Sequence, residues 1–501
     1  MRADPVIEKR LQSLESHLTH ENPVLLSAVK SFRELDRVAY RMGLLKRTQS
    51  YATLIPWWPL ISVLGTFSSG KSTFINYYLD YPLQLTGNQA VDDKFTVVCH
   101  GREGEVHTLP GLALDADPRF PFYQIGEEID KVAEGEGRRI DAYLQLKTCP
   151  SEVLRGKILI DSPGFDADEQ RTSILRITEH IVDLSDLVLV FFDARHPEPG
   201  AMHDTLEYLV ADTIRRPDSS KFLYILNQID TAAREDNPEE VFGAWQRALS
   251  QKGLTAGRFY TIYNPEAANP IDDESLQRRF ESKRDRDLEE IRSRMEQVTI
   301  ERAYRIVGAL ESKARDIEER VVPLLSEAIG RWRRLTLGLD AVLLLVVLTA
   351  FLVITIQAGY WEGLRFTAPW FQSLMENANL GIAVAVVLVA LLAYLHHIMR
   401  NIAGRRVLKW LTAQAESSLD RASLAGAFRK STRFWHRPFS QTPIGWGRRA
   451  RKRIARVVAD TDRFVQSLND RFADPTGKPK GTAEDSKSGS VATVRSDSEI
   501  Q

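Results

Sequence analysis

Cysteine is nearly absent from this sequence, which has 2 cysteines, Cys99 and Cys149, among 501 residues. Two cysteines supply neither a disulfide framework nor the ligand spacing of a zinc site, and they favour a reducing compartment. Neither sign of charge dominates, since the formal net charge is -1, and nothing in this balance favours nucleic acid as a partner. The first residues lack the apolar stretch of a secretory signal. A chain of this length predicts two or three structural units.

The strongest motif lies in residues 59–73, PLISVLGTFSSGKST, which hold a complete GxxxxGK[ST] pattern. The apolar run Leu60–Leu64 predicts a strand entering the pattern, and Ser72–Leu79 predicts a helix leaving it. Backbone N–H groups of such a loop close around a phosphate, and the helix N-terminus adds partial positive charge. The phosphate-binding residues are predicted to be Gly65, Ser69, Gly70, Lys71, Ser72 and Thr73.

A second motif follows the predicted strand Lys157–Ile160 and reads DSPG, from Asp161 to Gly164. In a phosphate-loop protein, a carboxylate at this point binds Mg²⁺, and the hydroxyl after the loop lysine is a further ligand. We therefore predict Ser72 and Asp161 as the metal ligands. The lysine of the first motif, Lys71, is predicted to reach the β- and γ-phosphates, and the Gly164 amide to contact the γ-phosphate.

A third motif, Asn227-Gln228-Ile229-Asp230, follows the apolar run Phe222–Leu226 and resembles the base-reading NKxD pattern. Asp230 is predicted to accept hydrogen bonds from guanine, and Asn227 to brace the phosphate loop. Gln228 keeps an aliphatic stem that can lie along the base, but it lacks the charge of lysine. An ordinary turn after a strand is the alternative interpretation of this segment.

Between residues 51 and 270, predicted strands and helices alternate. Such alternation predicts an α/β domain with a mostly parallel sheet covered on both faces, and a site at the carboxyl ends of its strands. Besides the strands already named, we expect strands at Phe95–Cys99, Leu187–Phe192 and Phe259–Tyr263. Helices are expected at 169–184, 201–214 and 238–249.

Apolar residues follow helical steps on both sides of this domain. Residues 1–50 predict helices of a bundle, divided at Asn22-Pro23. Residues 271–335 predict a helical stalk whose apolar stripe shifts between Val298 and Ala303, which indicates a stutter or a break. Pro323 is expected to kink or end the helix. Residues 401–473 predict further helices, with a basic cluster at 448–456 that either contacts lipid headgroups or forms a solvated face, and residues 474–501 predict a disordered tail.

Two apolar segments, at about 338–358 and 379–399, are each long enough to span a bilayer, and the first carries no charge over Ala341–Ile356. The hairpin 336–400 would then join two membrane-spanning helices, with a pair of buried core helices as the alternative. Arginines precede the first segment and follow the second, so the positive-inside rule predicts that both termini are cytosolic. The prediction is a two-pass integral membrane protein with the lipid bilayer as a partner.

The segments GTFSSGKSTFINYYL, GNQAVDDKFTVVCHG, DSPGF and LNQID resemble the dynamin superfamily, above all its EH-domain branch and bacterial dynamin-like proteins. The placing of the apolar hairpin among helices is similar to that of mitofusins. The resemblance implies GTP as substrate with Mg²⁺, a homodimer or homo-oligomer formed through the α/β domain, and tethering, remodelling or fusion of membranes. A bacterial inner membrane is favoured. It also implies that Ser68 stabilises the transition state, and that Phe165 stands where small GTPases have glutamine.

The main departure from the family pattern is Asp92, which aligns where a metal-binding and water-positioning threonine belongs. Catalytic roles are therefore assigned to Ser68, Lys71 and Asp92, with the hydrolysis rate left open. A carboxylate at this place adds negative charge near the γ-phosphate. The alternatives to a GTPase are a nucleotide-gated membrane scaffold with little hydrolysis and an ATPase like the EH-domain branch.

Overall fold

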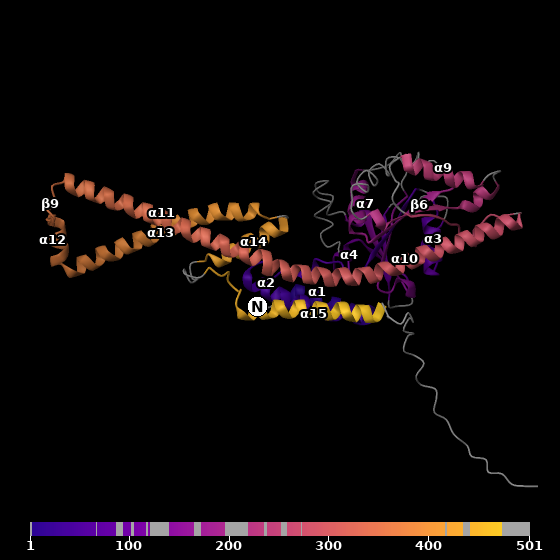
Figure 1. Cartoon of the computed structure of the whole chain (residues 1–501), viewed down its shortest axis with the longest axis horizontal. Coiled ribbons are helices and arrows are strands. Elements are labelled where there is room, and N and C mark those ends of the chain that lie inside the picture. The colour runs from indigo at the N-terminus through magenta and orange to yellow at the C-terminus, as the bar shows by residue number, and fades with distance from the viewer. Residues whose placement is uncertain are drawn as a thin grey trace, which may run out of the picture.

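The computed structural model shows an elongated molecule with an α/β domain at one end and two apolar helices at the other (Figure 1). A helical bundle lies between these ends, built from both terminal parts of the chain. The described residues are 3–66, 68–86, 94–101, 105–116, 119–120, 140–164, 172–195, 219–234, 238–251, 258–271, 273–415, 418–433 and 441–472.

An eight-stranded sheet forms the centre of the α/β domain, in the order β3-β4-β2-β5-β1-β6-β7-β8. Five neighbouring strands, β5, β1, β6, β7 and β8, run parallel, whereas β2 pairs with β5 in the antiparallel sense. The mostly parallel sheet predicted from the sequence is confirmed, and β3 and β4 are additions to it. The strands are β1 Leu60–Gly65, β2 Phe95–His100, β3 His107–Pro110, β4 Leu144–Cys149, β5 Ile158–Asp161, β6 Leu187–Asp193, β7 Phe222–Asn227 and β8 Arg258–Thr261.

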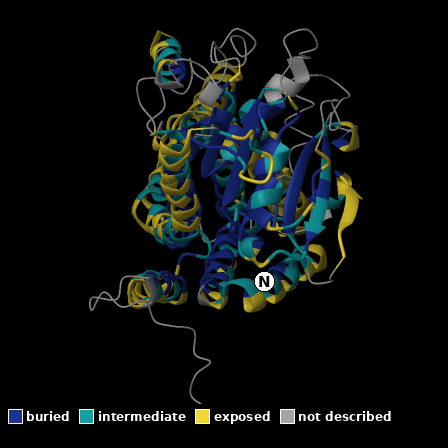
Figure 2. Ribbon diagram, turned by 90° about the vertical axis from the view of Figure 1, so that its right-hand side faces the viewer, coloured by how far each residue is buried: buried dark blue, intermediate teal, exposed yellow. Residues whose placement is uncertain are grey.

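Helices cover both faces of this sheet, so its central strands are buried along their whole length instead of alternating between buried and exposed residues (Figure 2). On one face the side chains of β1 and β6 pack with α3 and α10, and on the other they pack with α9. The predicted helix at 201–214 lies outside the described residues. The helical segments of the domain are η1 Tyr51–Thr53, α3 Lys71–Leu79, α4 Leu112–Ala116, α6 Ile140–Tyr143, η3 Glu152–Leu154, α7 Thr172–Leu184, η4 Ser219–Lys221, η5 Ile229–Arg234 and α9 Pro238–Gln251.

One continuous helical run of 84 residues, Glu274–Gln357, connects the α/β domain to the apolar end. At 1.5 Å per residue it is about 126 Å long. It consists of α10 Glu274–Arg315, a π-helical segment Asp316–Val321 and α11 Val322–Gln357. Of the two outcomes expected at Pro323, a kink or an end of the helix, the end is wrong. The proline falls in the first turn of α11, where the preceding π-helical turn lets the helix continue past a residue without an N–H.

The shift of the apolar stripe on α10 has a structural reason other than a break. Leu288, Ile291 and Met295 pack against the sheet of the α/β domain. From Ala303 onward, the stripe packs instead in the core of the bundle. The helix stays regular between the two stripes and changes its partner, so the buried face rotates without an interruption of the hydrogen-bonded ladder.

The bundle is formed by α1 Pro5–Glu21, α2 Pro23–Met42, α14 Ser418–Ser431 and α15 Arg448–Phe472 together with α10 and α11. The first two helices divide at Asn22, as the sequence predicts. The apolar face of α15 packs against α2 and α10. The basic cluster lies at the start of α15, and its Arg453 pairs with Glu34 at 3.3 Å.

The far end of the molecule consists of the second half of α11, a small tip and α13 Ala378–Ala413. Both helices are long and apolar enough to cross a membrane, and 6% and 0% of their most apolar stretches are buried. They are therefore not buried core helices. His396 Nδ1 on α13 lies 2.7 Å from Asp340 Oδ2 on α11 and joins the two. The tip contains β9 Trp361–Glu362, β10 Arg365–Phe366 and α12 Pro369–Glu376, with Phe366 at the centre of an aromatic cluster.

Candidate nucleotide-binding site

The phosphate loop connects the end of β1 at Gly65 to the start of α3 at Lys71. A Cβ atom added to Gly65 would lie 2.6 Å from the carbonyl oxygen of Phe191, so β6 leaves no room for a side chain. Gly70 has a φ of +83°, and a Cβ there would lie 2.2 Å from Asn227 Nδ2. Both glycines of the motif are thus required by close packing, and Gly70 also by its left-handed backbone.

Lys71 is the buried cation of this loop, with 8% of its surface exposed. Its Nζ donates hydrogen bonds to the carbonyl oxygens of Gly65 at 2.9 Å and Thr66 at 3.0 Å. An ammonium has three donors, so the geometry leaves a third for a phosphate oxygen. Burial lowers the pKa of Lys71 to about 8, and the nearby Asp161 carboxylate acts in the opposite direction. A bound phosphate would likewise favour the charged form.

Asp161 ends β5, where it lies opposite Val63 of β1, the strand that leads into the phosphate loop. Its carboxylate is buried, and its Oδ2 accepts a hydrogen bond from Gln84 Nε2 at 2.6 Å. Gln84 Oε1 in turn accepts one from Lys147 Nζ at 2.6 Å. The chain Lys147–Gln84–Asp161 therefore fixes one carboxylate oxygen.

The two predicted metal ligands, Ser72 in the first turn of α3 and Asp161, offer a hydroxyl and a carboxylate. Within the described ranges, no group of three or more His, Cys, Asp or Glu side chains could hold a metal ion. Magnesium suits this donor set, because it binds through one or two protein oxygens and takes its other ligands from water and phosphate. The residues present fit Mg²⁺.

The motif after β7 contacts the phosphate loop directly. Asn227 Nδ2 donates to the Ser69 carbonyl oxygen at 2.9 Å, and Gln228 Nε2 donates to that of Ser68 at 2.6 Å. Asp230 accepts two hydrogen bonds from Asn269, from the main chain at 2.9 Å and the side chain at 3.2 Å. The structure thus uses the Gln228 amide to hold the loop, a contact that the sequence did not predict.

Three residues of this region escaped the sequence analysis. Gln84 belongs to no motif, and only the fold places it on Asp161. Arg195, just after β6, pairs with Asp193 at 2.6 Å, and its Nη2 also lies 3.4 Å from the Ser68 carbonyl oxygen. Asn269 follows β8, and the rule that sites form beyond the carboxyl ends of parallel strands could have drawn attention to it.

The predicted site residues of the phosphate loop and of the motif after β7 lie together at the carboxyl edge of the sheet. Gly164 follows Asp161 at the same edge and is exposed. Asp92 and Phe165 lie outside the described residues.

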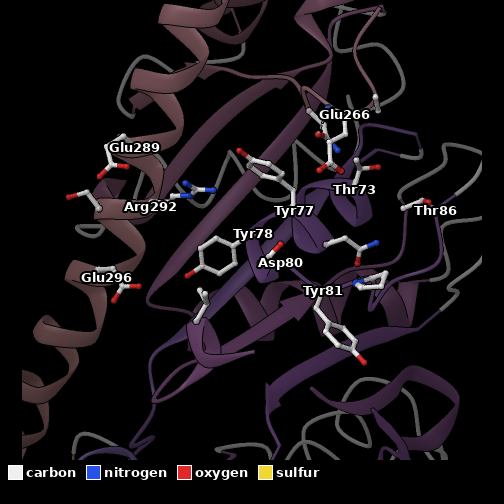
Figure 3. Close-up of a pocket in the computed structure, with 16 residues that line it drawn as sticks. Thr73, Tyr77, Tyr78, Asp80, Tyr81, Thr86, Glu266, Glu289, Arg292 and Glu296 are labelled. Atoms are coloured by element: carbon white, nitrogen blue, oxygen red, sulfur yellow. Dashed lines mark hydrogen bonds between the residues drawn. The ribbon is translucent and has the colours of Figure 1, made fainter. Parts of the chain in front are cut away.

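A polar groove of about 1200 Å³ lies beside the site, between α3 and α10 (Figure 3). Thr73 and Tyr77 of α3 line it from one side, and Glu289 and Arg292 of α10 from the other, with the Arg292 guanidinium 5.4 Å from the Tyr77 ring centre. Lys71 and Asp161 do not line it. The groove lies between the phosphate-loop helix and the long helix, and it adjoins the predicted phosphate site through Thr73.

The strand–loop–helix with its buried lysine, the carboxylate at the end of the neighbouring strand and the asparagine loop bonded to it define a phosphate-loop domain of the G-protein type. Residues 61–229 match the Dynamin family. This part of the chain is therefore similar to that family.

Relatives in this family match only part of the chain. Human EH domain-containing protein 1 is 33% identical over 147 residues, which are 27% of this chain and 25% of that protein. Mouse EH domain-containing protein 2 is 29% identical over 201 residues, or 38% of this chain and 34% of that protein. The chain thus spans a quarter to a third of the length of these relatives.

Among solved structures, a chain of an oligomerised bacterial dynamin pair, described as sensing and tethering membranes, aligns with 92% of this chain and 75% of its own length. The TM-score is 0.31 and the sequence identity 12%.

Proposed function

We propose that this protein is a membrane-anchored dynamin-like GTPase that binds and hydrolyses GTP with Mg²⁺. The observation that carries the proposal is the interlocked site, in which Asn227 and Gln228 bond the carbonyl groups of the phosphate loop while Lys71 is buried beneath it. The base loop and the phosphate loop then form one rigid unit. The match of residues 61–229 to the Dynamin family supports the same conclusion.

The roles of the residues follow from their positions. Lys71 would donate to the β- and γ-phosphates and, with Ser68, stabilise charge in the transition state. Ser72 and Asp161 would hold Mg²⁺, which neutralises phosphate charge when bound. Asp230 would accept hydrogen bonds from the guanine base, and its two contacts with Asn269 orient the carboxylate for this.

The apolar helices support a two-pass membrane anchor, because their apolar side chains are exposed along 335–356 and 380–402. Both termini and the α/β domain would lie on the cytosolic side, by the positive-inside rule. The bacterial inner membrane remains the favoured location. Nucleotide-dependent dimerisation through the α/β domain would act on the membrane for tethering, remodelling or fusion.

The long helix supplies a physical connection for this coupling. Arg302 on α10 donates from Nε to Asp186 Oδ2 at 3.0 Å, and the same oxygen accepts the N–H of Leu60 at 3.0 Å. Asp186 directly precedes β6, and Leu60 begins β1, the strand that leads to the phosphate loop. A displacement of these strands would therefore reach α10 and, through it, α11.

The test is GTP hydrolysis by the full chain in liposomes, under multiple-turnover and single-turnover conditions, with ATP as competitor. Lys71→Ala is expected to lower the rate by about 10²- to 10³-fold, the usual value of one electrostatic contact in the transition state. Lys30→Ala, which removes an exposed lysine from the bundle, is the matched control. Full turnover by Lys71→Ala would refute the site.

A rate no higher than that of the uncatalysed reaction, with tight GTP binding, would favour the nucleotide-gated scaffold. The position of Asp92 in the sequence motivates this alternative. Tighter binding of ATP than of GTP would favour an ATPase, for which the replacement of lysine by Gln228 is the motivating observation.

A further inference from the structure

A second cavity lies between α11 and α13, far from the nucleotide site. Its volume is about 570 Å³, and it is lined by Arg331, Arg334, Leu335, Arg406, Val407 and Trp410. Three arginines and an indole therefore surround one space, although α11 and α13 contribute them from positions about 70 residues apart. We call these six residues the arginine pocket.

The arginine pocket begins where the apolar surface of the two helices ends. On α11 the exposed large apolar side chains start at Leu335, and on α13 they end at Ile402. Arg334 directly precedes the first, and Arg406 lies one helical turn beyond the second. If the apolar surface spans the hydrocarbon layer, the pocket lies in the headgroup layer on the side of the α/β domain.

The walls of the pocket are held by contacts between the two helices. Trp332 Nε1 on α11 donates to the Arg400 carbonyl oxygen on α13 at 3.3 Å, and the Arg400 guanidinium lies 4.9 Å from the Trp332 ring centre. Val407, which also lines the pocket, is buried. The spacing of the arginines is therefore set by helix packing.

The charges in the pocket are only partly neutralised. Arg331 pairs with Glu327 at 2.7 Å, and its guanidinium lies 4.0 Å from the Trp410 ring centre. Within the part of the chain that the structure describes, neither Arg334 nor Arg406 has a hydrogen-bond or ion-pair partner. Two guanidinium groups thus keep their donors available, and planar guanidinium groups match the oxygens of a phosphate.

We propose that the arginine pocket binds the phosphate of an anionic phospholipid headgroup, and that this lipid joins α11 to α13 at the membrane surface. This inference depends on the membrane anchor of the proposed function. Free phosphate shares the charge that the arginines recognise. A lipid is favoured as its source because apolar Leu335 and Val407 also line the cavity and because the pocket adjoins the exposed apolar surface.

The test measures lipid binding by the detergent-solubilised full chain. Dioctanoyl phosphatidylglycerol is titrated against the chain, with dioctanoyl phosphatidylcholine, glycerol 3-phosphate and inorganic phosphate as separate probes. Arg334→Gln/Arg406→Gln should weaken phosphatidylglycerol binding about thirtyfold, since each arginine near a membrane surface contributes roughly a factor of five. Arg334→Lys/Arg406→Lys should restore part of the affinity, because charge returns without the planar fork.

The control variant Arg278→Gln/Arg286→Gln removes the same charge from exposed positions on α10 beside the α/β domain and should bind like the unmodified chain. Unchanged binding by the Arg334/Arg406 variant would overturn the proposal. So would glycerol 3-phosphate or inorganic phosphate binding as tightly as the lipid.

Anchoring is measured separately, by flotation of the full chain with neutral phosphatidylcholine vesicles after a carbonate wash. If the chain does not float with the vesicles, the membrane anchor fails and the lipid pocket fails with it. If it floats but the arginine variants bind lipid equally well, only the pocket is refuted.

Discussion

Protonation of Lys71 should make nucleotide binding depend on pH in a measurable way. In the structure, burial lowers the pKa of this ammonium to about 8. A bound triphosphate favours the charged form and raises the pKa, so binding takes up a proton wherever the free protein has lost one. Affinity should be highest below pH 8 and fall as the pH rises above it. Between pH 7 and pH 9 the protonated fraction falls about tenfold, which weakens binding by about 1.4 kcal/mol.

Isothermal titration calorimetry in two buffers with different ionisation enthalpies measures this proton uptake directly. With a pKa of about 8 in the free protein, binding should take up about 0.1 proton at pH 7 and about 0.8 proton at pH 8.5. Arginine stays protonated throughout this range, so Lys71→Arg serves as the control and should lose the uptake at pH 8.5. An uptake near zero at pH 8.5 in the unmodified chain would show that Lys71 does not titrate against bound phosphate.

Two further predictions concern the stability of the fold. Arg302→Met should lower the free energy of unfolding by about 3 kcal/mol, since it removes a partner of the buried Asp186 carboxylate. Arg305→Met, which removes a half-exposed partner of the same carboxylate, should cost less than about 1 kcal/mol in urea denaturation; equal costs would contradict this reasoning. Burial raises the pKa of Asp36 to about 7. The contribution of Asp36 to the free energy of unfolding is therefore complete below pH 3.8 and is lost as the pH rises through 7. The loss amounts to at most about 4 kcal/mol. The urea midpoint of Asp36→Asn should therefore rise relative to that of the unmodified chain between pH 4 and pH 7. Parallel plots of urea midpoint against pH for the two proteins would refute the prediction.

The sequence predicted the strands with continuous apolar runs, because such runs are buried on both faces of a parallel sheet. β1, β6 and β7 therefore lie within a residue of their predicted bounds. β3 and β4 were missed for a physical reason. All four residues of β3 are exposed, and β4 combines buried with half-buried positions, so neither has a continuous apolar run.

The apolar stripe on α10 shows what helical periodicity can and cannot predict. Its shift between Val298 and Ala303 was visible in the sequence, but its cause was not, because a periodic pattern says which face is buried and not what covers it. Of the two outcomes expected at Pro323, a kink or an end, the end did not occur for a related reason. A proline disrupts the hydrogen bonds of a regular α-helix, whereas here a π-helical turn precedes it.

The sequence by itself determined the phosphate loop, the order of its companion motifs and the two apolar helices. These depend on backbone geometry and hydropathy within short segments. Only the tertiary structure decided that Gln84 holds Asp161, that Gln228 holds the phosphate loop, and that arginines from two separate helices surround one cavity. Such contacts join segments far apart in the chain, and their distances are set by strand order and helix packing, which no local pattern encodes.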